Sequence, residues 1–83
     1  MIPFTQSNMT KKEKLEQGIR NNPVNVSLES FEALIKVYGY IKERGKHPKA
    51  RIGDQTMPYK RQNPINPSYV KDLLQMIDTL QKR

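Results

Sequence analysis

The most regular feature of this chain is an apolar stripe with helical spacing over residues 28–38. Its apolar positions recur at intervals of three and four, which places them on one face of an α-helix. Ser27 precedes the stripe in the position of an N-cap, Glu29 lies in the first turn near the positive end of the helix dipole, and Gly39 ends the pattern. The core side of this predicted helix carries Leu28, Phe31, Leu34, Ile35 and Tyr38.

A second, broader stripe predicts a helix near the C-terminal end of the chain. Asn66 suits the N-cap and Pro67 suits the first turn, where a missing N–H costs nothing. The expected core side carries Tyr69, Val70, Leu73, Leu74, Ile77 and Leu80. The opposite side carries Lys71, Asp72, Gln75, Asp78 and Lys82.

A shorter helix is predicted near the start of the chain. Thr10 and Glu13 have the spacing of a capping box, in which each residue bonds the backbone of the other. The helix is expected to continue through about Arg20, because Asn21-Asn22-Pro23 follows and proline cannot continue the helical ladder. We expect residues 1–9 to be a flexible N-terminal tail and residues 10–83 to form a single domain. Whether residues 1–8 are an upstream extension stays open.

Three short strands are predicted between the second helix and the last one, at residues 40–44, 48–52 and 55–59. Gly45-Lys46 is expected to turn the first strand back, and Gly53-Asp54 is a two-residue hairpin signal. If Ile52 pairs with Gln55, Ala50 lies opposite Met57 and Arg51 lies opposite Thr56. Because side chains alternate along a strand, the core side then carries Ala50, Ile52 and Met57, and the open side carries His47, Lys49 and Arg51.

The predicted order of elements is helix, helix, three antiparallel strands and helix. Such an order is typical of an α+β domain with two layers, in which a three-stranded antiparallel sheet packs against helices. The chain has 83 residues, so it forms one small domain with a thin core.

The composition indicates a polyanionic partner. Formal net charge is +7, so nucleic acid or an acidic protein is expected to bind. There is no cysteine, which fits a reducing, cytoplasmic environment. One histidine and eight acidic residues, scattered along the chain, do not predict a metal site, and no other cofactor is expected. No apolar run approaches the roughly 20 residues that cross a membrane, so no membrane partner is expected.

The strongest candidate for chemistry is His47, the single histidine of the chain, which follows the glycine turn at Gly45. Imidazole can both accept and donate a proton near neutral pH, and neighbouring cations attract phosphates. A basic surface loop with one inert histidine would have the same sequence. The predicted RNA-binding residues are Arg44, Lys46, Lys49 and Arg51, extended by Lys60 and Arg61. Tyr40 and Tyr59 can stack on bases, although packing in the core or at its rim is the favoured interpretation for both.

Three stretches of sequence resemble the HicA toxins of prokaryotic toxin–antitoxin pairs. NPVNVS at 22–27, followed by an amphipathic helix and YGY at 38–40, is similar to the opening segment of longer members. GKH at 45–47 is similar to the catalytic Gly-Ser-His turn of the family. TMPY at 56–59 and NPINPSYV at 63–70 are similar to its third strand, loop and last helix. The resemblance extends from about Lys14 to Leu80.

The resemblance implies a fold like that of double-stranded-RNA-binding domains and an mRNA interferase that cuts messenger RNA without a metal. It implies that His47 is the catalytic residue, that Gly45 shapes its turn, and that an acidic HicB-type antitoxin covers the histidine. This chain has Lys46 where the family usually has serine, Pro48 where it often has a second histidine, and Ala50 where an aromatic residue is common. These differences keep a second interpretation open, a non-catalytic module that binds RNA or the antitoxin.

Overall fold

Three helices and three strands follow one another in the predicted order in a computed structural model, which describes residues 10–81. The predicted tail at residues 1–9 and Lys82, which was predicted on the polar side of the last helix, lie outside the described residues. The elements are α2 (Lys11–Asn21), α3 (Leu28–Tyr38), β1 (Tyr40–Lys42), β2 (Lys49–Ile52), β3 (Gln55–Pro58) and α4 (Pro67–Gln81). The prediction of an α+β fold is therefore confirmed.

Each helix begins at the cap that the sequence predicted. The Thr10 hydroxyl accepts a hydrogen bond from the backbone N–H of Glu13 at 3.1 Å, and the Glu13 carboxylate accepts one from the Thr10 N–H at 2.9 Å. Ser27 caps α3 with its hydroxyl. Asn66 caps α4, because its side-chain oxygen lies 2.9 Å from the backbone N–H two residues later. These bonds satisfy N–H groups that the first turn of a helix cannot pair internally.

The sheet is antiparallel with the strand order β1-β2-β3, and its second hairpin has the predicted register. Gly53 adopts a φ of 59° at the turn, in the left-handed region that favours glycine. The strands are shorter than predicted. Strand β1 ends at Lys42 and β2 begins at Lys49, because Pro48 has no N–H to donate to a ladder. Residues 43–48 therefore form a wide loop, called the His47 loop below, in place of the predicted tight turn at Gly45-Lys46.

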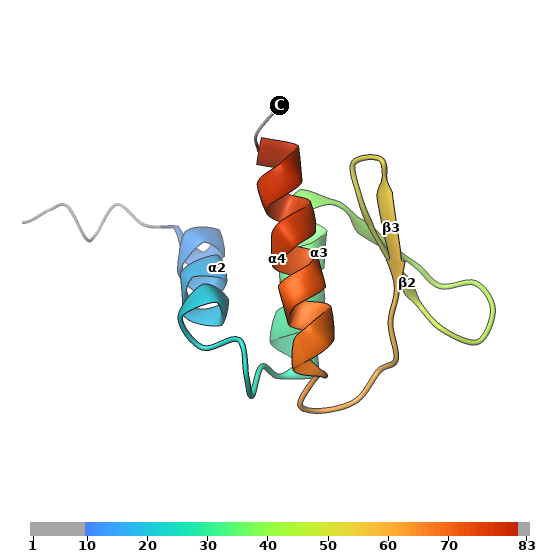
Figure 1. The fold of residues 1–83 in the computed structure, drawn as a ribbon, viewed down its shortest axis with the longest axis horizontal. Coiled ribbons are helices and arrows are strands. Elements are labelled where there is room, and N and C mark those ends of the chain that lie inside the picture. The colour runs from blue at the N-terminus through green and yellow to red at the C-terminus, as the bar shows by residue number, and fades with distance from the viewer. Residues whose placement is uncertain (1–9, 82–83) are drawn as a thin grey trace, which may run out of the picture.

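The helices α3 and α4 lie side by side on one face of the sheet, and α2 lies on the far side of this pair (Figure 1). The core forms where the sheet meets the pair. The predicted inward residues Ala50, Ile52 and Met57 are 0%, 0% and 8% exposed. Buried residues of the helices are Ile19, Phe31, Leu34, Ile35, Val70, Leu73, Met76 and Ile77, of which Met76 lay outside the predicted stripe. The opposite face of the sheet is left to solvent.

A polar cluster fastens α2 to the rest of the domain. The Glu16 carboxylate accepts hydrogen bonds from Arg20 at 2.8 Å and from the Tyr38 hydroxyl of α3. Arg20 also pairs with Asp78 of α4 at 2.7 Å. The hydrogen bonds from Arg20 to Asp78 and Glu16 raise the pKa of its guanidinium, and partial burial and the bond to Glu16 raise the pKa of Tyr38. No helix within residues 10–81 has the length and apolar character needed to span a membrane.

Candidate nucleic-acid interface

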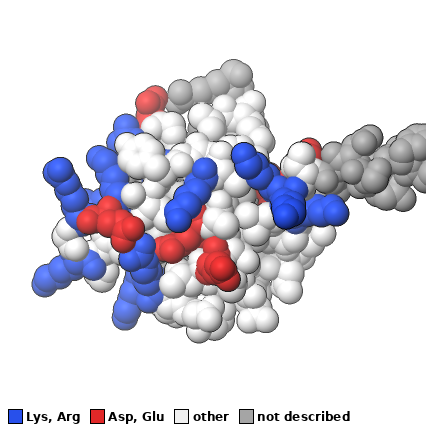
Figure 2. All heavy atoms as spheres, turned by 180° about the vertical axis from the view of Figure 1, so that it is seen from behind, with Lys and Arg blue, Asp and Glu red and all other residues white. Residues whose placement is uncertain are grey.

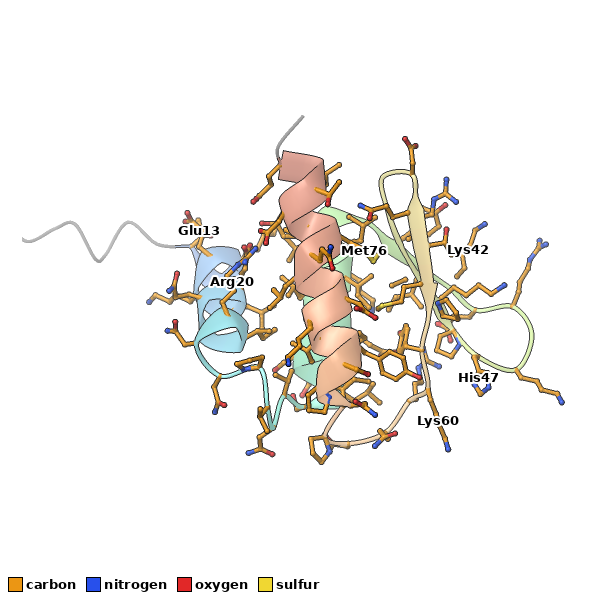
Figure 3. The ribbon with its side chains drawn as sticks, viewed as in Figure 1. Glu13, Arg20, Lys42, His47, Lys60 and Met76 are labelled. Carbon is orange, nitrogen blue, oxygen red and sulfur yellow. The ribbon has the colours of Figure 1, made fainter. Side chains whose placement is uncertain are left out.

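The His47 loop projects from the sheet on the side away from the helices (Figure 3). Gly45 has a φ of 79°, in the left-handed region that favours glycine, so this residue sets the local course of the loop. His47 is exposed, whereas the next residue, Pro48, is buried. The Pro48 carbonyl accepts a hydrogen bond from the Tyr59 N–H at 3.1 Å. The imidazole therefore stands in solvent one residue from a fixed point of the backbone.

A chain of hydrogen bonds holds the other end of the loop. The buried Tyr59 donates its hydroxyl to Glu32 of α3 at 2.6 Å, and Arg61 donates to the same carboxylate oxygen at 2.7 Å. Arg61 also pairs with Glu43, the first residue of the His47 loop, at 3.0 Å. The Tyr59 ring packs edge-on against Phe31, with centroids 5.0 Å apart. The loop is thus connected through three side chains to the core.

This network changes the pKa values of its members. Partial burial acts to raise the pKa of Glu32, but the hydrogen bonds from Tyr59 and Arg61 outweigh it and lower the pKa. Burial and the bond to Glu32 raise the pKa of Tyr59. The hydrogen bonds of Arg61 to Glu32 and Glu43 raise the pKa of its guanidinium. The favoured interpretation of Tyr59 as a packing residue is confirmed, since it is 1% exposed.

Arg61 was expected to extend the RNA-binding surface. In the structure its guanidinium faces two carboxylates, so its positive charge is balanced within the protein. Its position assigns it a role in holding the His47 loop. Lys60, its neighbour, is exposed.

The outer face of the sheet carries two of the predicted cations, Lys49 and Arg51. In the register, Tyr40 lies opposite Arg51, and Lys42 lies opposite Lys49. Since Ala50 between them is buried, the side chains of these four residues lie on the side away from the core. We call this surface the outer face. Lysine and arginine side chains gather on the sheet side of the molecule, which is the left of Figure 2.

Lys42 is a residue that the sequence analysis missed. It is exposed and directly faces Lys49 across the strands. Only the register between β1 and β2 reveals this pair. The other cation of the outer face is held in place, because Arg51 donates to the Gly53 carbonyl and to the Thr56 hydroxyl, each at 3.0 Å. These two acceptors are neutral, so the two bonds orient the guanidinium.

Figure 3 shows how the remaining candidates are distributed. His47, Lys42 and Lys60 all lie on the sheet side of the molecule, whereas Arg20 lies on α2 at the opposite side. The two other predicted cations, Arg44 and Lys46, are exposed within the His47 loop. A surface of this kind can bind a chain of phosphates. Among residues 10–81, no group of three histidine, cysteine or acidic residues is placed to hold a metal ion.

Comparison of the chain with models of protein families, with curated proteins and with solved structures found no match. The resemblance to HicA toxins therefore depends on the three sequence stretches described above.

Proposed function

We propose that this protein binds RNA on the side of the sheet away from the core and cuts it with His47. In this proposal it is a metal-independent ribonuclease of a HicA/HicB-type toxin–antitoxin pair that acts in the cytoplasm. One observation carries the proposal. The single histidine of the chain is exposed between two fixed ends of a loop, and the strands on either side of that loop carry lysines on the outer face.

The proposed reaction needs one base and positive charge. The neutral imidazole of His47 takes the proton from a ribose 2′-hydroxyl, and the 2′-oxygen attacks the adjacent phosphorus. The bond from phosphorus to the 5′-oxygen breaks, and that oxygen takes up a proton from the imidazolium or from water. The products are a 2′,3′-cyclic phosphate and a 5′-hydroxyl. Lys46 and Arg44 supply positive charge toward the phosphate oxygens in the transition state.

An acidic antitoxin is the proposed protein partner. The net charge of +7 favours association with a negatively charged surface. An antitoxin of this kind inhibits by covering His47 and the outer face, so it competes with RNA. Titration of a preformed complex with RNA tests this, because simultaneous binding of both partners contradicts competition.

A second candidate function is RNA binding without cleavage. One observation favours it. Within residues 10–81 the structure records no hydrogen bond or ion pair of the His47 side chain, so no second residue orients the imidazole. If the protein cleaves RNA, the bound RNA itself has to orient the imidazole of His47.

The test compares the full chain with its His47→Ala variant on labelled RNA, in the presence of a chelator. Loss of a general base lowers the cleavage rate by about 100-fold or more, while binding persists. Lys71→Gln is the matched control, because Lys71 is exposed on α4, away from the sheet. Equal cleavage by the His47→Ala variant contradicts the proposed mechanism. Wild-type protein that binds RNA and leaves it uncut supports the second candidate. Bacterial growth on expression of each variant gives the same comparison in cells.

A further inference from the structure

The outer face carries an exposed aromatic ring beside its cations. Tyr40 is 53% exposed, one of two large hydrophobic residues exposed to this degree among the described residues. It begins β1, lies opposite Arg51 and shares its face with Lys42, two residues further along the strand. At about 3.4 Å per residue, the two side chains leave the strand about 6.8 Å apart. One nucleotide covers such a span.

The facing lysines Lys42 and Lys49 indicate which group of a ligand binds beside the Tyr40 ring. Like charges directly opposite each other on neighbouring strands destabilise a sheet. An anion between Lys42 and Lys49 removes this repulsion, so binding of a phosphate is favoured by relief of an unfavourable contact in the free protein. Charge complementarity thus points to a phosphate, and Tyr40 supplies a flat apolar surface beside it.

A polynucleotide provides both a phosphate and a flat base, but the face of the base is free only in single-stranded form. In a duplex the faces of the bases are covered by neighbouring bases, so a tyrosine ring cannot reach them. In a single strand the bases are free to stack on aromatic side chains, with little dependence on sequence.

We infer that the outer face binds single-stranded RNA, with an unpaired base stacked on Tyr40 and a phosphate held between Lys42 and Lys49. This inference rests on the RNA binding of the proposed function and is independent of cleavage by His47. Arg51, fixed by its bonds to Gly53 and Thr56, faces the edge of the same nucleotide or the next phosphate.

The experiment uses the full chain with His47→Gln, so that RNA stays intact. Fluorescence anisotropy measures its affinity for a short labelled oligoadenylate and for an RNA duplex of the same length. Adding Tyr40→Leu is expected to weaken binding of the single strand by about 5- to 150-fold, the range found for loss of one stacked base. Binding of the duplex is expected to be unchanged, and Tyr40→Phe is expected to retain most of the single-strand affinity.

Salt dependence separates the two parts of the site. Lys42→Gln and Lys49→Gln are each expected to reduce the slope of log affinity against log salt, by about 0.7 together for the one phosphate that they hold, while Tyr40→Leu leaves the slope unchanged. Lys71→Gln is the control for a cation elsewhere on the surface. Thermal unfolding followed by circular dichroism checks that every variant is folded.

The outcomes separate this inference from the proposed function. Cleavage by the wild-type protein with no effect of Tyr40→Leu overturns the inference alone. Binding that depends on Tyr40 in a protein that cuts no RNA supports the inference and contradicts the nuclease. Equal loss of single-strand and duplex binding overturns the stacking of an unpaired base. Tight binding of poly-glutamate with the same dependence on Tyr40 assigns the face to an acidic protein segment and also overturns the inference.

Discussion

Neutralising either of the two facing lysines is expected to stabilise the fold while it weakens RNA binding. Lys42 and Lys49 pair directly in the antiparallel register, and both side chains are exposed. Neighbouring strands lie about 4.8 Å apart, and a cross-strand pair contributes about 0.2–1 kcal/mol, with an unfavourable sign for like charges.

The size of the effect follows from Coulomb's law. Two unit charges about 5 Å apart in water repel by about 0.8 kcal/mol, and a Debye length of about 10 Å at 0.1 M salt reduces this to about 0.5 kcal/mol. Lys42→Gln is therefore expected to raise the free energy of unfolding by up to about 0.5 kcal/mol. For a domain of this size that change raises the midpoint of thermal unfolding by about 2–4 °C.

Urea unfolding of the wild type, the two single variants and the double variant measures the coupling. Because the first substitution already removes the repulsion, the double variant is expected to gain no more than one single variant. The gain is expected to shrink at about 0.5 M salt, where screening is stronger. Lys71→Gln on α4 is the control and is expected to change stability little. Single variants that destabilise the protein, or gains that do not depend on salt, refute the reasoning.

Two further predictions concern how the sheet and the His47 loop are held. Gly39→Ala is expected to cost about 1–3 kcal/mol in urea unfolding, because an ideal Cβ there lies 1.9 Å from the Arg51 carbonyl oxygen; wild-type stability contradicts this. Glu32→Gln is expected to lower the free energy of unfolding above pH 4.5, the ordinary pKa of this carboxyl group, and to lower it progressively less as pH falls. The reason is that partial burial of Glu32 is outweighed by its hydrogen bonds, including that from Tyr59, which lower its pKa in the folded state. Parallel stability–pH curves for this variant, the wild type and the exposed control Glu29→Gln contradict the second prediction.

Features that depend on neighbours in the sequence could be predicted. The caps at Thr10, Ser27 and Asn66 are bonds between residues two or three positions apart, and the apolar stripes follow from the geometry of one helix. The register between β2 and β3 could also be predicted, because the two-residue turn at Gly53-Asp54 leaves little choice of pairing.

Features that depend on distant partners could not be predicted from these patterns. The role of Arg61 depends on Glu32 and Glu43, which come from α3 and from the His47 loop. Residues 43–48 form a loop too long to set a register, so the sequence could not show that Lys42 faces Lys49. Each cation is visible in the sequence, whereas their arrangement relative to each other belongs to the folded sheet.

The same sheet explains why the fold tolerates the lysine pair. Lys42 lies next to Ile41, which packs against the core opposite the fully buried Ala50. A shift of β1 by one residue would separate the lysines, but it would also turn Ile41 to solvent and Lys42 toward the core. Full burial of an isoleucine contributes about 1.5–3 kcal/mol, which exceeds the repulsion of about 0.5 kcal/mol even when burial is partial. The core therefore holds the two lysines opposite each other, where a bound phosphate would remove their electrostatic repulsion.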